Sequence, residues 1–337
     1  MTTNGASGRA RASRQATAAE TSGPDGVELL GRMWLIRAFE EKVAELYARG
    51  QLGGLVHLGI GQEAVAIGIS SQLRPGDTVV GGHRAHGHAL AMGADPAATF
   101  AELAGRATGL CGGKGGSMHL VAAEAGFLTA TGVVAGNVPL ALGAAFAAKV
   151  RGTDAVAVAV FGDGAGQAGQ FHESLNLASL WNLPVILVCE NNGYAEFTPL
   201  SAHTKVERLS QSAANYGIPG VVIDGNDVSQ VQDAAAEAVA RARLGKGPSL
   251  IECLTYRLRG HYEGDPGKYR DPAELAAWRA KDPIERFATR LQATGVLEAD
   301  TATEIETRMR LRIAEAAEAG LAGPLPVAAD LTRSVYA

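Results

Sequence analysis

The stretch AVAVAVFGDGAGQAG, residues 155–169, decides the fold. Its first half is an apolar alternating run, which predicts a strand, and the strand leads directly into a polar loop rich in glycine. A second apolar run, residues 184–189, leads in the same way into the loop Glu190-Asn191-Asn192-Gly193-Tyr194. Apolar residues at helical spacing between the two, from Phe171 to Trp181, predict a crossover helix. The sequence therefore predicts two parallel strands whose polar loops lie at one edge of the same sheet.

The two loops carry oxygen-bearing side chains suited to a magnesium site. Asp163 and Asn192 offer a carboxylate and an amide oxygen, and Mg²⁺ prefers oxygen ligands together with water or phosphate. Glycines at 164, 166 and 169 would let a diphosphate approach backbone N–H groups at the start of the helix. Either loop alone is common in turns, but the joint pattern at two strand ends favours a ligand site. It is not a nicotinamide fingerprint, because no Gly-x-Gly-x-x-Gly opens the helix.

The rest of the chain continues the alternation of strands and helices, so we expect an α/β protein with a central, mostly parallel sheet and helices on both faces. Further strands are expected at residues 78–81, 221–223 and 250–253. Helices are expected at 27–49, 61–73, 97–104, 138–150 and 229–243, and amphipathic helices over 272–319. Residues 83–88 are expected to form a histidine-rich turn, and 122–137 and 256–270 to form loops.

Composition limits the classes of partner and location. The 337 residues carry 30 basic and 35 acidic side chains, a net charge of −5, which makes nucleic acid a poor partner. No apolar stretch reaches the ~20 residues of a membrane span. Cys111, Cys189 and Cys253 form no Cys-x-x-Cys pair, so we expect reduced thiols and a cytoplasmic protein. We expect residues 1–26 to be a disordered tail and 27–337 to be one α/β domain with a helical C-terminal region.

At these loops the chain resembles a known family. The two blocks resemble the thiamine-diphosphate signature, and the flanking sequence is similar to α subunits of the decarboxylating component of 2-oxo acid dehydrogenase complexes. Within it, the acetoin dehydrogenase branch is the most similar and the pyruvate branch comes next. The resemblance runs from about residue 29 to about residue 270. Other matching motifs are HLGIGQEA at 57–64, HRAHGH at 83–88, GKGGSMH at 113–119 and RGH at 259–261.

The resemblance implies the thiamine-diphosphate-binding fold and a set of cofactor contacts. It adds the backbone carbonyl of Tyr194 to Asp163 and Asn192 as a third magnesium ligand, and backbone groups of Gly164 and Ala165 would contact the diphosphate. Gly132 and Val134 would hold the aminopyrimidine through main-chain groups. The remaining candidates are arginines and a histidine near the diphosphate. They are Arg84 and Arg257, whose guanidinium forks match phosphate oxygens, and His83, where many relatives have tyrosine.

Histidines are the candidates for acid–base and orienting roles. His57 and His261 are expected at the active site, where an imidazole could donate to a developing oxyanion or relay a proton near neutral pH. His57 would orient the substrate, and His261, on a loop, would bind cofactor and meet the acceptor. His86 and His119 are secondary candidates. Lys114 could lie near a phosphate, although an exposed lysine is the simpler interpretation.

The resemblance also implies partners and a reaction. The chain would need thiamine diphosphate and Mg²⁺, cleave acetoin or a 2-oxo acid such as pyruvate, and pass the acyl or hydroxyalkyl fragment to the lipoyl group of an acyltransferase. No glutamate here clearly serves to activate the cofactor ring, so a β subunit would supply it, in an α₂β₂ heterotetramer. Three alternatives remain open at this point: a thiamine-dependent two-carbon transferase acting on a carrier protein, a non-catalytic assembly subunit, and a nucleotide-binding module.

Overall fold

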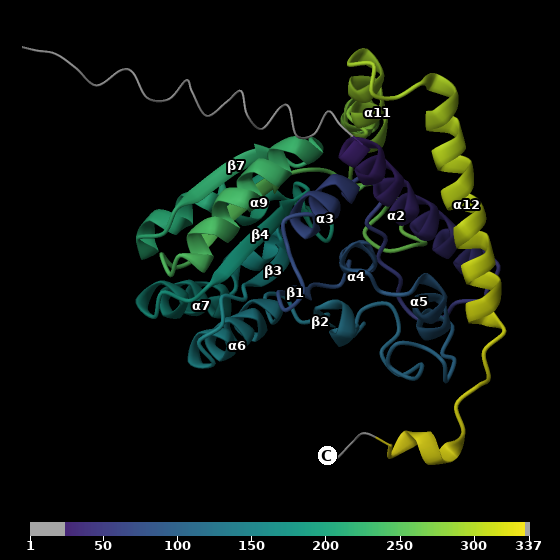
Figure 1. The fold of residues 1–337 in the computed structure, drawn as a ribbon, viewed down its shortest axis with the longest axis horizontal. Helices are drawn as coiled ribbons and strands as arrows, with labels where there is room; N and C mark the ends of the chain where they lie inside the picture. The colour runs from purple at the N-terminus through teal and green to yellow at the C-terminus, as the bar shows by residue number, and fades with distance from the viewer. Residues whose placement is uncertain (1–23, 334–337) are drawn as a thin grey trace, which may run out of the picture.

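The computed structural model describes residues 24–333 of the chain, and a parallel sheet lies at its centre (Figure 1). The sheet has six strands in the order β2-β1-β3-β4-β8-β7, and every neighbouring pair is parallel. All six carboxyl ends therefore point to the same edge. The strands are β1 (Thr78–Gly81), β2 (Phe127–Ala130), β3 (Ala157–Gly162), β4 (Val185–Asn191), β7 (Gly220–Asp224) and β8 (Ser249–Leu254).

Two apolar clusters cover the two faces of the sheet, because alternate side chains of a strand point to opposite faces. On β3, Val158 and Val160 belong to one cluster, whereas Ala157 and Ala159 belong to the other. Helices α3 (Glu63–Ser70), α4 (His86–Met92) and α9 (Val228–Arg243) pack on the first face. On the second face pack α6 (Asn137–Val150), α7 (Gly169–Leu180) and the 3₁₀ segment η3 (Leu209–Tyr216).

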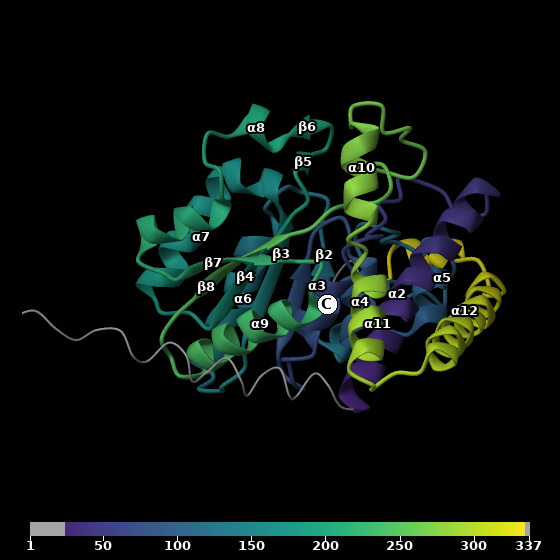
Figure 2. The ribbon, with the colours of Figure 1, turned by 90° about the horizontal axis from the view of Figure 1, so that it is seen from above.

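A helical layer flanks the first face. Helix α12 (Ala299–Leu321) runs alongside α2 (Pro24–Ala48) and α5 (Pro96–Leu103), as Figure 1 shows. Figure 2 shows α10 (Pro272–Arg279) near the short β5–β6 hairpin (Tyr194–Ala195 and Thr198–Pro199) and α8 (Leu200–His203), with α11 (Pro283–Ala293) below. Short 3₁₀ turns complete the chain: η1 (Ala123–Ala125), η2 (Asp163–Gln167) and η4 (Ala328–Leu331). Within the described residues, no helix has the length and apolar character needed to cross a membrane.

The predicted fold class is confirmed, and β3 and β4 are neighbours, with Gly162 paired to Glu190. Two expectations were wrong. The stretch 122–137 contains strand β2, which the sequence hides because it is only four residues long and pairs with β1 alone at the sheet edge. The predicted turn at 83–88 ends in helix α4, which begins at His86 and is buried over its first six residues. Buried packing rather than local sequence pattern favours both elements.

Boundaries also shift at the N-terminal helix. Helix α2 begins at Pro24, three residues earlier than expected, because the fixed φ of proline suits the first turn of a helix. Of the expected tail at 1–26, residues 1–23 lie outside the described part of the chain. Cys189 and Cys253 are buried free thiols in β4 and β8, and Cys111 is half-buried and also free.

Candidate functional site

A cavity of about 460 Å³ lies at the carboxyl edge of the sheet. Segments that follow five of the six strands line it, after β1, β2, β3, β4 and β8. All twelve primary candidates from the sequence for cofactor, metal or catalytic roles are part of its lining. They are His57, His83, Arg84, Gly132, Val134, Asp163, Gly164, Ala165, Asn192, Tyr194, Arg257 and His261. The parallel topology brings these segments together, since a ligand cavity forms where strand ends meet.

Asp163 and Asn192 lie on adjacent strand ends and are both buried. Asp163 opens the η2 turn directly after β3, and its Oδ2 atom has no hydrogen-bond partner in the described part of the chain. Asn192 donates from Nδ2 to Gln62 Oε1 at 3.3 Å and accepts at Oδ1 from the backbone N–H of Tyr194, also at 3.3 Å. A buried carboxylate oxygen without a donor is unfavourable. A cation beside Asp163 would remove that cost, and carboxylate, amide and carbonyl oxygens suit Mg²⁺.

The turn after Asp163 differs in one detail from the expected helix start. Residues Asp163–Gln167 form a 3₁₀ turn, and α7 begins only at Gly169. Gly164 is required there, because a Cβ at this position would lie 2.8 Å from the Cβ of Ala195. The backbone of Gly164 and Ala165 therefore lines the cavity next to β5. A ligand in the cavity would contact this 3₁₀ turn rather than the N-terminus of α7.

Two buried guanidinium groups face the same cavity. Arg257 is 1% exposed and donates from Nη1 to the Tyr194 carbonyl at 3.4 Å and from Nη2 to Tyr269 Oη at 2.8 Å. Arg84 donates to the carbonyls of Leu58 and His261, both at 2.7 Å. Among residues 24–333, neither arginine forms an ion pair with a carboxylate. Burial, followed by repulsion from Arg257, lowers the pKa of Arg84 to about 9. An anion in the cavity would relieve this repulsion.

Three imidazoles, His57, His83 and His261, form a histidine cluster in the cavity. The ring centroids of His57 lie 4.8 Å from His83 and 4.9 Å from His261. Burial, followed by the Arg84 charge, lowers the pKa of His57 to about 4 and that of His261 to about 3. The same two causes hold the pKa of His83 well below its usual value. The cluster is therefore neutral at pH 7, so the expected titration near neutral pH does not fit the ligand-free chain.

Arg84 fixes the tautomer of His261. Its Nη2 atom lies 3.1 Å from His261 Nδ1, and a guanidinium can only donate hydrogen bonds. The Nδ1 atom therefore accepts, and the hydrogen of the neutral ring lies on Nε2. Asp265 holds the same loop, since its Oδ2 accepts from the backbone N–H of His261 at 2.6 Å and from Tyr269 Oη at 2.8 Å. His261 is thus positioned as a neutral N–H donor.

The loop after β2 forms an exposed rim of the cavity. Val133 and Val134 are 63% and 62% exposed, which is unusual for valines beside a binding site. The Val134 carbonyl accepts from Gln170 Nε2 at 2.6 Å, and Gly132 lies beside it in the lining. Ala135 has a φ of 60°, in the left-handed region that favours glycine. Such strain persists only where the surrounding structure imposes it, and it is concentrated at functional sites.

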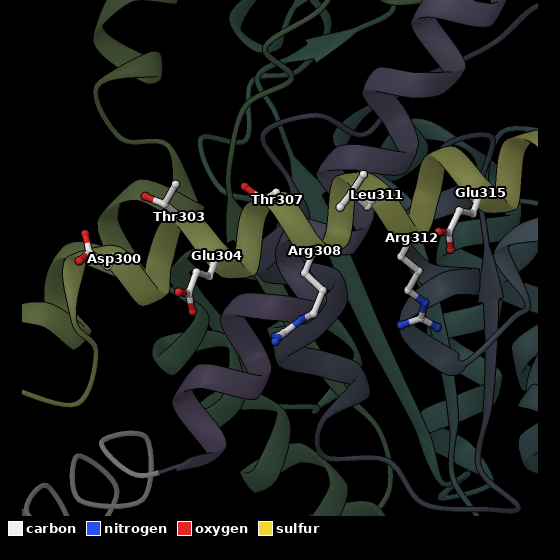
Figure 3. Close-up of a pocket in the computed structure, with 8 residues that line it drawn as sticks. All are labelled: Asp300, Thr303, Glu304, Thr307, Arg308, Leu311, Arg312 and Glu315. Atoms are coloured by element: carbon white, nitrogen blue, oxygen red, sulfur yellow. The ribbon is translucent and has the colours of Figure 1, made fainter.

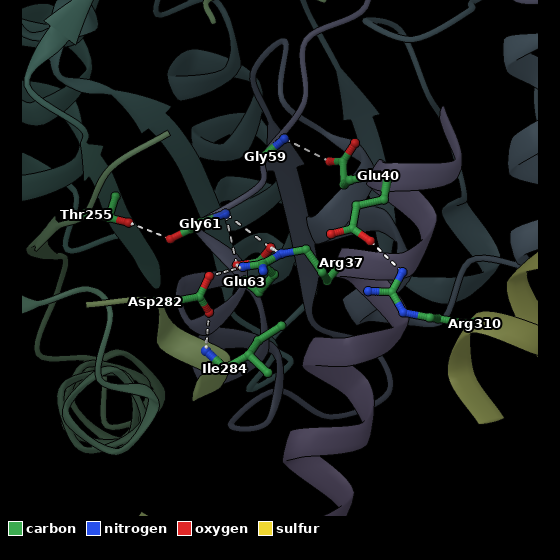
Figure 4. Close-up of polar contacts among 10 residues, drawn as sticks. Arg37, Glu40, Gly59, Gly61, Glu63, Thr255, Asp282, Ile284 and Arg310 are labelled. Atoms are coloured by element: carbon green, nitrogen blue, oxygen red, sulfur yellow. Dashed lines mark hydrogen bonds and ion pairs between the residues drawn. The ribbon is translucent and has the colours of Figure 1, made fainter. Parts of the chain in front are cut away.

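The turn that carries His57 rests on buried ion pairs, shown in Figure 4. Glu63 is 1% exposed, and its Oε1 atom lies 2.6 Å from Arg37 Nε. The same oxygen accepts a hydrogen bond from the Gly61 N–H at 3.1 Å. Arg37 also pairs with Asp282 at 2.9 Å, at the start of α11. Gly61 has a φ of 99°, and a Cβ there would meet the Tyr256 carbonyl at 2.6 Å. These contacts between α2, α3 and α11 fix the backbone beside His57.

The secondary candidates lie outside the cavity lining. His86 is fully buried, with Nδ1 2.9 Å from Glu40 Oε2 and Nε2 2.9 Å from Ser117 Oγ, so it links helices to the glycine-rich loop. His119 is exposed. Lys114 is exposed too and donates to the Arg333 carbonyl at 2.7 Å, which agrees with the simpler interpretation.

Sequence reasoning missed three residues at or beside the cavity. His88 and Glu190 line it, with His88 Nε2 2.9 Å from Glu190 Oε1. His88 belongs to the motif at residues 83–88 and Glu190 to the loop at 190–194, so membership of these two motifs was a usable signal. His203 lies behind Asp163, with Nε2 3.4 Å from Asp163 Oδ2. Nothing in the sequence pattern connects residues so far apart.

A larger hollow, of about 730 Å³, lies along α12 (Figure 3). Its eight lining residues recur at helical spacing on this one helix, and they carry charges of both signs. It is the outer face of α12, without the convergent polar groups from several elements that a binding site needs. The eight residues that line this hollow are Asp300, Thr303, Glu304, Thr307, Arg308, Leu311, Arg312 and Glu315.

Comparison with known proteins agrees with the geometry. The model of the family described as "Dehydrogenase E1 component" matches residues 31–326. The α subunit of acetoin:2,6-dichlorophenolindophenol oxidoreductase from Bacillus subtilis is 46% identical over 306 residues, which cover 90% of this chain and 91% of that protein. The Cupriavidus necator protein of the same name is 43% identical over 328 residues, 97% and 98% of the two chains. The α subunit of the pyruvate dehydrogenase E1 component from Rhizobium meliloti is 46% identical over 316 residues, 94% and 91%.

Proposed function

Because the chain belongs to the dehydrogenase E1 component family, we propose that it is the α subunit of a thiamine-diphosphate- and Mg²⁺-dependent dehydrogenase. Its substrate is acetoin or a 2-oxo acid such as pyruvate, in keeping with the names of its relatives. The fragment left after cleavage passes to the lipoyl group of an acyltransferase. Residues from 27 onward act as one α/β domain, since the two apolar clusters share one sheet.

One observation carries the proposal. Within residues 24–333, a buried carboxylate with an oxygen that accepts no hydrogen bond, and two buried guanidiniums without carboxylate partners, face one cavity. An anion would interact favourably with the two guanidiniums, and a cation would interact favourably with the carboxylate. A magnesium diphosphate supplies both charges in one ligand. A nucleotide could do the same, but the family to which the chain belongs favours thiamine diphosphate.

The proposed ligand contacts follow from the lining. Asp163, Asn192 and the Tyr194 carbonyl hold Mg²⁺, while Arg84 and Arg257 bind the diphosphate with backbone groups of Gly164 and Ala165. Gly132 and Val134 hold the aminopyrimidine, and His83 lies at the diphosphate side with His261. The Val134 carbonyl is engaged by Gln170, so a ring contact there uses other main-chain groups of the loop or displaces that side chain.

When bound, thiamine diphosphate supplies a carbon nucleophile and an electron sink for cleaving the bond beside a carbonyl group. This chain supplies orientation and hydrogen bonds. His261, with its hydrogen on Nε2, can donate to an oxygen that gains negative charge, and His57 orients the substrate beside it. Both rings are neutral donors in the ligand-free chain, which suits stabilisation of an oxyanion better than delivery of a proton.

A partner subunit completes the cavity in this proposal. The exposed rim valines, Val133 and Val134, and Leu55, which is 54% exposed, line the same cavity as the buried Asp163 and Arg257. A second exposed apolar area lies on α6 and α7. Its members are Leu140, Phe146, Val150, Leu180 and Trp181. Exposed apolar side chains gathered in this way mark subunit contacts, and we propose a β subunit in an α₂β₂ assembly, in agreement with the term "subunit alpha" in the relatives' names.

Titration calorimetry and turnover test the proposal together. The native complex, purified with the subunits that accompany the chain, should bind thiamine diphosphate only with Mg²⁺ and reduce an artificial electron acceptor with acetoin or pyruvate. Asp163→Ala should abolish both. Tight magnesium-dependent binding of nucleotide without binding of thiamine diphosphate would overturn the proposal. Full activity of the Asp163→Ala complex would instead assign the chain a purely assembling role.

A further inference from the structure

The side chain of Gln170 connects two segments that form opposite parts of the proposed cofactor site. Its Nε2 atom donates to the Val134 carbonyl at 2.6 Å. Val134 belongs to the loop after β2, the proposed place of the aminopyrimidine, whereas Gln170 follows the η2 turn that begins at the metal candidate Asp163. Gln170 itself is not part of the cavity lining. Any effect of this side chain on a bound cofactor is therefore exerted through the loop that it contacts.

The start of α7 holds Gln170 firmly in place. Ala168 donates its backbone N–H to the Ala165 carbonyl at 3.0 Å, and Phe171 donates its own to the Ala168 carbonyl at 3.0 Å. Phe171 is fully buried, and its ring centroid lies 5.5 Å from that of Phe161 in β3. These contacts join the first turn of α7 to the η2 turn and to the sheet, so Gln170 has a fixed position relative to the metal side of the cavity.

Residues 132–134 form the tip of the loop after β2, and they have few other attachments. All three residues of this loop tip are exposed. Among residues 24–333, the bond from Gln170 is the one hydrogen bond by which another segment reaches the loop tip. The next residue, Ala135, has a φ of 60°, a backbone conformation that is unfavourable for alanine. Exposure and strain favour other conformations of the loop tip, and the hydrogen bond from Gln170 opposes them.

We propose that Gln170 is a positioning residue for the cofactor ring, because its hydrogen bond holds the loop tip where main-chain groups can meet that ring. The inference rests on the proposed function, since it requires thiamine diphosphate in the cavity. The ring then contacts main-chain groups of the loop other than the Val134 carbonyl, which stays bonded to Gln170. Inorganic diphosphate has no ring, so it binds beside Asp163 and the arginines without using the loop tip.

A comparison of two ligands tests the proposal without reference to turnover. Titration calorimetry of the native complex measures the dissociation constants of thiamine diphosphate and of inorganic diphosphate, each with Mg²⁺. Gln170→Met removes the donor but keeps an unbranched side chain that suits a helix. It should weaken binding of thiamine diphosphate about fivefold, as expected for one neutral hydrogen bond, and leave the constant for inorganic diphosphate unchanged. Gln170→Lys again offers an N–H donor. Because its charge acts on both ligands, the ratio of the two constants should return to the wild-type value.

Gln167→Met is the matched control. Gln167 is an exposed residue of the η2 turn, and its side chain forms no hydrogen bond within the described part of the chain. Its ratio of dissociation constants should equal that of wild type. The inference is wrong, while the proposed function stands, if the ratio in Gln170→Met stays within about twofold of wild type, if Gln167→Met shows an equal loss, or if Gln170→Met binds thiamine diphosphate more tightly. If wild type binds thiamine diphosphate no more tightly than inorganic diphosphate, the proposed function fails together with the inference.

Discussion

Replacing Arg257 by methionine should weaken cofactor binding without unfolding the chain. Arg257 is 1% exposed and forms no ion pair with a carboxylate of residues 24–333, so its charge faces the cavity uncompensated. It also repels Arg84, whose pKa falls to about 9 through burial and then through this repulsion. Arg257→Met loses the bonds to the carbonyls of Tyr194 and Glu196 and to Tyr269 Oη but relieves that repulsion. We expect the free energy of unfolding of the ligand-free chain to change far less than the binding free energy.

The size of the effect follows from Coulomb's law. A guanidinium about 5 Å from one negative charge, at an effective dielectric constant of about 20, contributes about 3 kcal/mol. That corresponds to a rise of about two orders of magnitude in the dissociation constant of the magnesium diphosphate cofactor. A surface arginine, by comparison, contributes about 0 to 1 kcal/mol to any ion pair it forms.

Arg259→Met is the matched control. Arg259 lies two residues away in the same loop, has a half-exposed side chain and pairs with Glu263 at 3.8 Å, outside the cavity lining. Both variants remove one positive charge, so a general charge effect would weaken both equally. Titration calorimetry of the native complex with thiamine diphosphate and Mg²⁺ separates them. Dissociation constants for the two variants within about threefold of each other would refute the assignment of Arg257 to the diphosphate.

The other predictions concern buried groups around the cavity. Glu63→Leu leaves the buried Arg37 short of a partner and should lower the free energy of unfolding by about 3 to 5 kcal/mol in urea titrations. Glu102 accepts four backbone N–H groups of the loop 111–116, so Glu102→Gln should speed proteolysis of that loop about tenfold without shifting other cleavage sites. The pKa values of the histidine cluster lie below those of the unfolded chain, which therefore binds more protons below about pH 6.5. Stability of the ligand-free chain should fall from pH 6.5 toward pH 4, less steeply in His261→Gln than in wild type; equal slopes in the two proteins would contradict the pKa assignments.

Local sequence patterns were sufficient to predict most of the strands and helices and most of the candidate residues that line the cavity. The strand ending at Asp163 and the one ending before Asn192 are long, buried and separated by one helix, so their adjacency followed from chain connectivity. Strand β2 and the start of α4 at His86 depend on packing against distant segments and left no periodic signal. His203 is the extreme case, because only the backward turn of the chain after β4 places it beside Asp163.

The electrostatics of the cavity link cofactor binding to protons. Burial, and after it the charges of the two buried guanidiniums, lowers the pKa values of His57 and His261 and keeps these rings neutral. A bound diphosphate brings negative charge that opposes this repulsion, while Mg²⁺ beside Asp163 offsets part of that charge, so we expect the pKa values of the rings nearest the diphosphate oxygens to rise. By linkage, cofactor binding then takes up protons below about pH 6.5. The stability of the cofactor-bound chain should therefore fall less steeply with acid than that of the ligand-free chain. In the proposed complex, the histidine cluster would thus gain basicity only after the cofactor is in place, and the cavity would acquire its acid–base capacity from the bound ligand.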